Sequence, residues 1–289
     1  MVLETQVGRV LDVGRTQFGE RSLFGIDGGE MRGEAIAGTV REGGLDFHLV
    51  LDNGVVESEQ VLILQADNGE ALYMRSCGVA PSTDDSVRFV PDIEALQGGA
   101  YDWLNTATLV GVRDFDPVAR TVTFRIYDVS AEAGDAAQAT PAVVIERPEG
   151  SPGQLWACAT HSATAGDLVL SETVTLAETV TVGESKRGMR AIIPITGGTV
   201  TGEVEGVVVP GGGDFQIIGT TYNLDARYTL ETNDGEFILV RNCGEVTGLV
   251  PTFEARAAGP YNWLNEGLWS SAFPFPLIGA VMISIYEAQ

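Results

Sequence analysis

A five-residue motif occurs twice in this chain and relates its two halves. The first copy reads Tyr-Asp-Trp-Leu-Asn at 101–105, and the second reads Tyr-Asn-Trp-Leu-Asn at 261–265. Gly28-Gly29 matches Gly197-Gly198, and other segments match in the same order at nearly the same separation. Since the separation changes only at expected loops, the sequence indicates a tandem duplication of one domain.

The length of 289 residues agrees with two domains, because units of about 145 residues are close to the usual domain size. The segment 130–153 is rich in Ala, Asp, Gln, Pro and Gly, which is typical of a linker. We therefore expect a first domain over 1–145 and a second over 146–289.

Short segments with apolar residues at alternate positions recur in both halves, and turn residues end each segment. Asn-Gly at 53–54 and 68–69 and Asp-Gly at 234–235 are typical of hairpins, since their central residues tolerate positive φ. Helical periodicity is nearly absent, and we expect only a turn of helix at 92–96 and at 252–257. The pattern predicts an all-β protein of two tandem antiparallel β-barrels related by internal duplication.

The formal net charge of -23 restricts the partners of this protein. A surface this acidic repels phosphate backbones and anionic lipids, so we expect neither nucleic-acid nor membrane binding. The N-terminus lacks the basic and apolar regions of a signal peptide, and no run of about 18 apolar residues appears. The sequence predicts a cytoplasmic protein.

The three cysteines are Cys77, Cys158 and Cys243. Cys77 and Cys243 are equivalent in the two repeats, whereas Cys158 has no counterpart. We expect buried free thiols in a reducing cytoplasm rather than a disulfide framework.

Five segments of the second half resemble, in the right order, the bacterial and fungal family catalogued as domain of unknown function 3237. These segments are Ile195 to Gly198 with Gly202-Glu203, Pro210 to Phe215, Leu224 to Tyr228, Arg241-Asn242, and Tyr261-x-Trp263-Leu264-Asn265. The resemblance implies a small β-barrel of the lipocalin or allene-oxide-cyclase type. The family mostly lacks an assigned activity. Some fungal relatives are linked to cofactor-free ring closure of phenolic polyketides, in which a hydroxyl adds across a carbon–carbon double bond.

Asp225 and Arg227 are two residues apart on an expected strand, so their side chains share one face. If that face is the barrel interior, Asp225 is a candidate catalytic residue for proton transfer. Arg227, with Arg241 on the next strand, would then bind an oxyanion or a carboxylate. The alternative is a structural ion pair, inside the barrel or on its surface.

Further residues are expected near the mouth or wall of the same pocket. The candidate substrate-binding residues are Asp214, Tyr228, Arg241, Tyr261, Trp263 and Asn265. Their counterparts in the first domain, together with that of Asp225, are Asp46, Glu59, Arg75, Trp103 and Asn105. The tryptophans are alternatively plugs of the apolar core.

The first domain departs from the second at several of these positions. Val61 and Leu62 stand where Arg227 and Tyr228 stand in the second domain. His48 replaces Gln216, although a lone His on a strand is more often a partly exposed core residue than a base. We therefore expect a partly degenerate pocket in 1–145 and the functional pocket in 146–289.

The sequence favours a cofactor-independent cyclase or isomerase that acts on a small, apolar, oxygenated substrate of phenolic or polyketide-like type. Two hypotheses from other classes stay open: a lipocalin-like binding protein for a hydrophobic metabolite, and a structural tandem barrel whose acidic surface binds another protein. With His48 and His161 as the only histidines, the sequence excludes a histidine-rich metal site, and acidic Ca²⁺ binding stays possible without an Asp-x-Asp-x-Asp-Gly loop to support it. We expect neither a metal nor a cofactor. The sheet edges and the Phe-Pro-Phe-Pro segment at 273–276 are candidate contacts of a homodimer.

Overall fold

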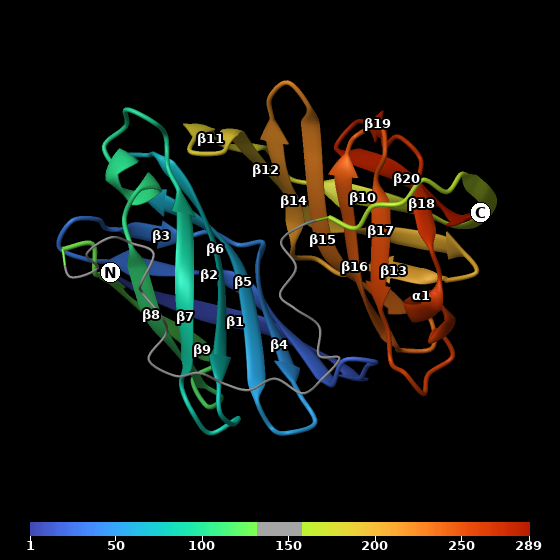
Figure 1. Ribbon diagram of the computed structural model, residues 1–289, viewed down its shortest axis with the longest axis horizontal. Helices are drawn as coiled ribbons and strands as arrows, with labels where there is room; N and C mark the ends of the chain where they lie inside the picture. Colours follow the sequence, from blue (N-terminus) through green and yellow to red (C-terminus); the bar gives the residue numbers. More distant parts are fainter. Residues whose placement is uncertain (132–157) are drawn as a thin grey trace. The chain divides into compact units, whose positions relative to one another are not determined.

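A computed structural model describes residues 1–131 and 158–289 (Figure 1). The chain forms two compact units. Of the described residues, the first unit comprises Met1–Val10, 18–131 and Val182–Arg187, and the second comprises Leu11–Gln17, 158–181 and Gly188–Gln289. The boundary expected between residues 145 and 146, and most of the expected linker, lie outside the described residues.

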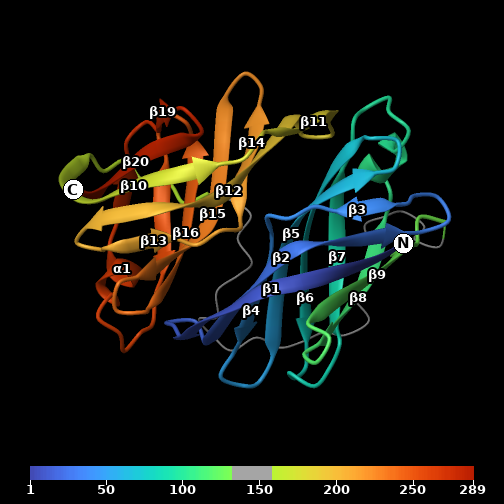
Figure 2. The same cartoon turned by 180° about the vertical axis from the view of Figure 1, so that it is seen from behind.

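The first unit contains an antiparallel sheet that closes on itself. Its strands are β1 (Val2–Arg15), β2 (Glu20–Arg32), β3 (Gly38–Val40), β4 (Gly44–Val50), β5 (Val56–Ala66), β6 (Ala71–Ala80), β7 (Val87–Glu94), β8 (Leu109–Asp116) and β9 (Thr121–Asp128). Hydrogen-bonded neighbours follow the order β1-β9-β8-β7-β6-β5-β3-β2, and β1 also pairs with β2. Figure 2 shows β1 between β2 and β9. The result is a closed eight-stranded barrel to which β4 adds by pairing with β2 and β5.

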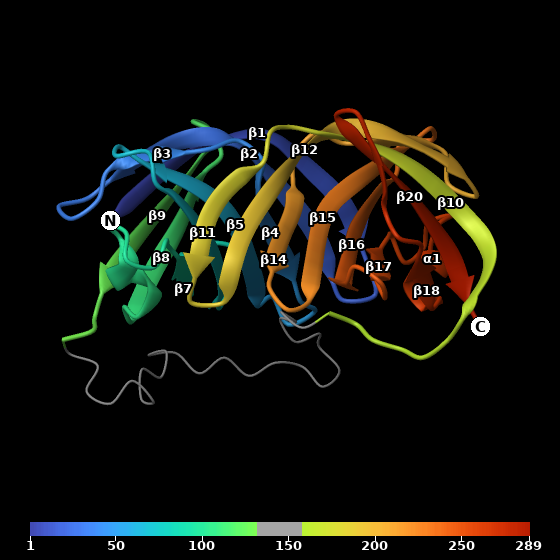
Figure 3. The ribbon, with the colours of Figure 1, turned by 90° about the horizontal axis from the view of Figure 1, so that it is seen from above.

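Most of an 11-stranded antiparallel sheet lies in the second unit, and this sheet follows the path β17-β16-β15-β13-β12-β10-β20-β18. Its strands are β10 (Ala165–Leu176), β11 (Val180–Ser185), β12 (Gly188–Gly202), β13 (Gly206–Val208), β14 (Gly213–Ile218), β15 (Tyr222–Thr232), β16 (Phe237–Glu245), β17 (Val250–Glu254), β18 (Trp269–Ser271), β19 (Phe275–Leu277) and β20 (Ala280–Ala288). Figure 3 shows β10 beside β20, its partner in the ladder. A backbone hydrogen bond from Ser271 N–H to Leu249 C=O, 3.1 Å long, connects the two ends of the path. The predicted all-β fold of two tandem units is confirmed.

Equivalent glycines let neighbouring strands approach closely in both units. A Cβ on Gly29 would lie 2.2 Å from the carbonyl oxygen of Glu4, and one on Gly198 would lie 2.1 Å from that of Thr173. Any side chain at either position would therefore collide with the backbone of the adjacent strand. This requirement explains why the Gly-Gly pairs recur in the two repeats.

The two helical turns among the described residues lie at the repeated motif and not before it. They are η1 (Asp102–Asn105) and α1 (Trp263–Glu266), whereas the expected positions at 92–96 and 252–257 fall largely in strands β7 and β17. The expectation was wrong because the motif folds locally around a buried leucine, Leu104 or Leu264, each 1% exposed. No helix in the described part of the chain is long and apolar enough to span a membrane.

A disulfide joins Cys158 to Cys243, with the two Cα atoms 5.3 Å apart. The expectation of free thiols was therefore wrong for these two residues, while Cys77 takes part in no disulfide with a described residue. The sequence contains no sign of this pairing, because only folding brings the two residues together across 85 positions.

Candidate active site

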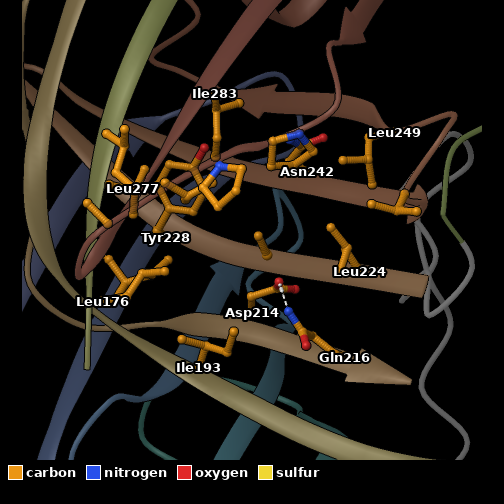
Figure 4. A pocket seen from close by; sticks show the side chains of 18 of the residues that line it. Leu176, Ile193, Asp214, Gln216, Leu224, Tyr228, Asn242, Leu249, Leu277 and Ile283 are labelled. Atoms are coloured by element: carbon orange, nitrogen blue, oxygen red, sulfur yellow. Dashed lines mark hydrogen bonds between the residues drawn. The ribbon is translucent and has the colours of Figure 1, made fainter. Parts of the chain in front are cut away.

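A pocket of about 430 Å³ lies within the second unit (Figure 4). Most of its wall is apolar and comes from strands β10, β12, β15 and β20, with residues of the segment 273–277. Polar side chains in the wall include those of Asp214, Gln216, Tyr222, Tyr228 and Asn242. An apolar cavity with a few converging polar groups is the usual form of a small-molecule site.

Asp214 extends into the pocket from β14, where it lies opposite Ile193 and Ala226, which also line the wall. Gln216 Nε2 donates a hydrogen bond of 2.6 Å to Asp214 Oδ2, drawn in Figure 4. The backbone N–H of Asp225 donates one of 3.2 Å to Asp214 Oδ1. Burial raises the pKa of Asp214 to about 6, and these hydrogen bonds only partly offset that effect. The carboxyl group can therefore gain and lose a proton near neutral pH.

Tyr222 extends this hydrogen-bonded chain, because its hydroxyl donates to Gln216 Oε1 at 2.7 Å. The amide nitrogen of Gln216 thus donates to Asp214, and its amide oxygen accepts from Tyr222. Such a chain fixes the orientation of the Asp214 carboxyl group, which a proton-transfer group requires.

A second buried carboxyl group belongs to Glu172 on β10. The hydroxyl of Tyr228 donates a hydrogen bond of 2.5 Å to Glu172 Oε2, and the two residues are 2% and 1% exposed. Burial raises the pKa of Glu172 to about 7 and places that of Tyr228 well above its usual value. Tyr228 lines the pocket, so this pair connects the apolar core to the site.

Asn242 on β16 supplies a further polar group. Its Nδ2 donates to the Ser271 hydroxyl at 3.1 Å, while its buried Oδ1 has no hydrogen-bond partner within 1–131 and 158–289. A buried hydrogen-bond acceptor without a partner costs free energy. A ligand that donates a hydrogen bond to Asn242 Oδ1 would remove this cost and so bind more tightly. Within the same residues, no group of three or more His, Cys, Asp or Glu side chains is arranged to hold a metal ion.

Asp225, Arg227 and Arg241 form an ion cluster that does not line this pocket. Asp225 accepts hydrogen bonds of 3.0 and 3.1 Å from Arg227 and of 2.8 and 3.0 Å from Arg241. Burial opposes ionisation of Asp225, but the two guanidinium groups outweigh it and hold its pKa at about 2.

Strand alternation explains this placement. Leu224 and Tyr228 line the pocket, so Asp225 and Arg227, at the odd-numbered positions between them, point to the other face of β15. The two residues do share a face, as expected. The hypothesis that this shared face lines the interior of the pocket is wrong.

The residues of the repeated motif also lie outside the pocket wall. The Tyr261 hydroxyl donates to Asp234 Oδ1 at 2.9 Å, and Asn265 exchanges hydrogen bonds with the backbone N–H and C=O of Ala255. Asn105 makes the same two bonds to Ala95 in the first unit. The asparagines therefore fasten the helical turn to the end of the preceding strand.

The two tryptophans of the motif are not core plugs. Trp103 is 38% exposed and Trp263 is 36% exposed. Trp263 packs edge-on against Trp269, with ring centroids 5.5 Å apart. The expected homodimer contact at 273–276 stays a prediction, and Phe273 and Phe275 are more than half exposed.

In the first unit, Asp46 stands where Asp214 stands in the second, but its surroundings differ. Arg113 Nε and Nη2 lie 2.8 and 2.5 Å from Asp46 Oδ2, and His48 Nε2 lies 3.5 Å from Oδ1. Burial opposes ionisation of Asp46, but Arg113 and His48 outweigh it and hold its pKa well below the usual range. When the two copies of the five-residue motif are aligned, Phe273 occupies the position of Arg113.

The remaining counterparts in the first unit serve structural contacts. Arg75 Nε donates to Asp92 Oδ2 at 2.9 Å, and Glu59 lies opposite Cys77 in the ladder. A pocket of about 390 Å³ is present in this unit, with Arg113 and His48 in its wall. The pocket of the first unit thus has Arg113, the partner of Asp46, in its wall. The pocket of the second unit has Asp214, an acid with a raised pKa, in its wall.

Sequence reasoning missed Glu172, although a signal exists. Leu170, Glu172 and Val174 occupy alternate positions on β10, and all three are buried. An acid within an inward apolar series is unusual unless it has a polar partner. Tyr228 is that partner, 56 residues away in sequence.

The model of the family described as Protein of unknown function (DUF3237) matches residues 1–129 and 166–250. The chain belongs to this family. Because the matches cover two separate segments, they also confirm the tandem duplication of a DUF3237 domain.

Individual relatives each match a part of this chain. A UPF0311 protein of Bradyrhizobium diazoefficiens is 46% identical over 78 residues, which are 26% of this chain and 51% of that protein. The chain thus spans about half the length of the curated relatives it matches. A crystal structure of a conserved protein of unknown function from Rhodopseudomonas palustris is 29% identical, with a TM-score of 0.40, and covers 45% of this chain and 100% of that one. A crystal structure of an enzyme from Penicillium herquei is 23% identical, with a TM-score of 0.39. This match covers 45% of our chain and 99% of the Penicillium chain.

Proposed function

We propose that the second unit binds a small, largely apolar, oxygenated molecule and catalyses a proton transfer on it without a cofactor. The observation that supports this most is the carboxyl group of Asp214 in an apolar pocket, with its pKa raised to about 6. An acid–base group works best when its pKa is near the working pH, and a pocket that excludes water strengthens its effect.

The reaction that fits this arrangement is ring closure of a phenolic or polyketide-like substrate. Asp214 takes the proton of a substrate hydroxyl while that oxygen forms a bond to one carbon of a C=C bond. The π electron pair moves to the other carbon, which takes the proton back from Asp214. The atoms balance as an isomerisation, so neither an oxidant nor water is consumed.

In this proposal Asp214 is the acid–base residue, and Gln216 and Tyr222 orient it through the hydrogen-bonded chain of 2.6 and 2.7 Å. Asp225, the residue favoured by the sequence, acts on Asp214 through its backbone N–H and through its charge, which contributes to the raised pKa of Asp214. Arg227 and Arg241 neutralise Asp225, and because Arg227 lies opposite Arg241 in the ladder, the cluster links β15 to β16.

The experiment is incubation of the protein with phenolic and polyketide-like extracts, native mass spectrometry of the complex, and chromatography of the released ligand. A product with unchanged mass and an altered ring structure supports cyclisation, and Asp214→Asn should abolish it. The matched control is Asp225→Asn, which removes a carboxylate that lies outside the pocket. If Asp214→Asn converts the substrate at the wild-type rate, the proposal is wrong.

The second candidate is a non-catalytic binding protein for a hydrophobic metabolite, which the apolar wall also favours. In that case the bound molecule would return chemically unchanged, and Asp214→Asn would alter affinity alone. A purely structural role needs no pocket, and the cavity of about 430 Å³ weighs against it.

A further inference from the structure

The Glu172–Tyr228 pair lies in a region that is otherwise apolar. Val200 on β12 and Ile283 on β20 are the cross-strand neighbours of Glu172, and both are buried. The titratable groups that act on this pair are its own two members and Asp214, which faces the same pocket. The pair is therefore a hydrogen-bonded acid and phenol without a compensating cation among these groups.

The first unit shows that the fold does not need this pair. When Gly69 is aligned with Gly235, Leu62 stands where Tyr228 stands. Leu3 stands where Glu172 stands, because Leu3 lies opposite Phe124 just as Glu172 lies opposite Ile283. Leu3 and Leu62 are fully buried, so two apolar side chains fill the same place in a closed barrel. Replacement of a buried polar pair by apolar residues is often neutral for stability, which points to a role beyond folding.

The pair also has unused hydrogen-bonding capacity. Glu172 Oε1 is buried and has no hydrogen-bond partner among the described residues, and an acceptor in that state favours protonation of the carboxyl group. A neutral carboxylic acid can donate its proton to the phenol oxygen across the 2.5 Å contact. The phenol O–H is then free to point into the pocket. Carboxylic acids held neutral by an apolar site are known to act in hydrogen-bond donation of this kind.

We infer that Tyr228 donates a hydrogen bond to a carbonyl or enolate oxygen of the ligand, and that Glu172 is the residue that positions the Tyr228 hydroxyl. This deepens the proposed function, on which it rests, by naming the substrate class: a molecule with a carbonyl group, or one that becomes an enolate when it loses a proton. Asp214 then moves the proton and Tyr228 stabilises the oxygen that gains charge.

The test compares two probes of similar size and different polarity, 2-acetonaphthone and 2-ethylnaphthalene, by fluorescence titration at pH 6. The wild-type protein should bind the ketone roughly fivefold more tightly, the ratio that one net hydrogen bond contributes. Tyr228→Phe should bring the ratio to about one with the hydrocarbon affinity retained, whereas Asp214→Asn should keep the ketone preference. Equal binding of the two probes by the wild type, or an unchanged ratio in Tyr228→Phe, would overturn the inference.

The pH dependence separates positioning by Glu172 from a structural role. The ketone preference of the wild type should fade as the pH rises above about 7. Ionised Glu172 accepts the hydrogen bond of the Tyr228 hydroxyl, so this hydroxyl can no longer donate to the ligand. Glu172→Gln retains an N–H donor for the phenol oxygen, so its preference should persist and lose its pH dependence. The double variant Glu172→Leu/Tyr228→Leu copies the first unit and should bind the hydrocarbon while losing the ketone preference. A pH-dependent preference in Glu172→Gln would contradict the role of Glu172.

This test is independent of turnover. If the ketone preference is present but no substrate is converted, the catalytic proposal fails and the inference about Tyr228 stands. If Asp214→Asn abolishes conversion but the wild type does not prefer the ketone, only the inference fails.

Discussion

Asp46 and Asp214 occupy the same position in the two repeats, and their carboxyl groups are shifted in opposite directions. Arg113 holds Asp46 ionised from 2.5 Å, whereas Phe273 stands at the corresponding place in the second unit. The acid that the repeats share is thus ionised and paired in one unit, whereas in the other its pKa is raised, which is why we propose it for proton transfer. Arg113, together with His48, accounts for the lowered pKa of Asp46, and Phe273 and Gln216 stand at the corresponding positions of the second unit.

The first prediction concerns the pH dependence of turnover. Asp214 must be ionised to accept a proton, so kcat/KM should rise with pH through about 6. Asp214→Asn should lower kcat/KM by a factor of about 100 to 10,000, the usual contribution of one acid–base group. Asp46→Asn makes the same change in the first unit and should leave kcat/KM unaltered. A wild-type profile without a limb near pH 6 would contradict the assignment.

Arg113→Met should destabilise the first unit, because Asp46 would become a buried charge without a partner. The expected loss is about 3–5 kcal/mol in the free energy of unfolding, measured with urea at pH 7. The folded-state pKa of Asp46 is lowered, so the stability from its ion pair is present above its unfolded value of 3.8 and is lost as the pH falls into the acid range. The variant should therefore lose less of its stability between pH 5 and pH 3 than the wild type loses.

Arg125→Met is the matched control for that experiment. Arg125 pairs with Asp114 at the surface, and the two side chains are 45% and 39% exposed. Exposed ion pairs contribute about 0–1 kcal/mol, so this variant should unfold almost as the wild type does. Equal effects of the two substitutions would show that burial of Asp46 does not determine the cost.

The Asp225 ion cluster should matter for stability more than for turnover. Asp225→Asn removes the charge that two guanidinium groups share, and we expect the free energy of unfolding to fall by several kcal/mol while kcat/KM changes less than about tenfold. The lowered pKa means that this stabilisation is present above pH 3.8 and is lost as the pH falls through about 2. If Asp225→Asn loses most of its turnover at unchanged stability, Asp225 is the catalytic residue that the sequence favoured.

The sequence is sufficient for the fold because the signals that define it are local or repeated. Turn dipeptides such as Asn68-Gly69 and the glycines at Gly29 and Gly198 mark hairpins and close strand contacts wherever they occur. Alternation also shows that Asp225 and Arg227 share a face. It does not show which face is the interior, since Leu224 and Tyr228 also lie on one face of the same strand and only the register with β14 and β16 decides.

The site itself depends on contacts between residues that are distant in sequence. Glu172 meets Tyr228 across 56 positions, and Arg113 meets Asp46 across 67. Strand pairing order sets these contacts, and the alternation of a single strand carries no information about it. The sequence could therefore name Asp214 and Tyr228 as candidates but not the partners that set their protonation.

The disulfide should stabilise the second unit. Closing a loop between residues 85 positions apart lowers the entropy of the unfolded chain, which corresponds to about 4.5 kcal/mol. Cys158→Ser should lower the free energy of unfolding by that amount, and a reducing agent should have the same effect on the wild type. Cys77→Ser, which removes the cysteine outside the disulfide, should keep the stabilisation that the disulfide provides and should remove the thiol that the oxidised protein offers to alkylation. If the oxidised protein alkylates at all three cysteines, the disulfide is absent in solution.

Glu172 should make the second unit less stable as the pH rises. Its folded-state pKa of about 7 lies above the unfolded value of 4.5, so the folded state binds the proton more tightly. The resulting stabilisation is complete below pH 4.5 and is lost as the pH rises through about 7, an amount of about 3 kcal/mol for a fully buried group. Glu172→Gln cannot ionise and should remove this part of the slope in urea unfolding between pH 4.5 and pH 7.5. The raised pKa of Asp214 adds a slope of the same sign, so Asp214→Asn is the companion variant. If the double variant Asp214→Asn/Glu172→Gln keeps the wild-type slope of stability against pH, neither carboxyl group is buried in its neutral form.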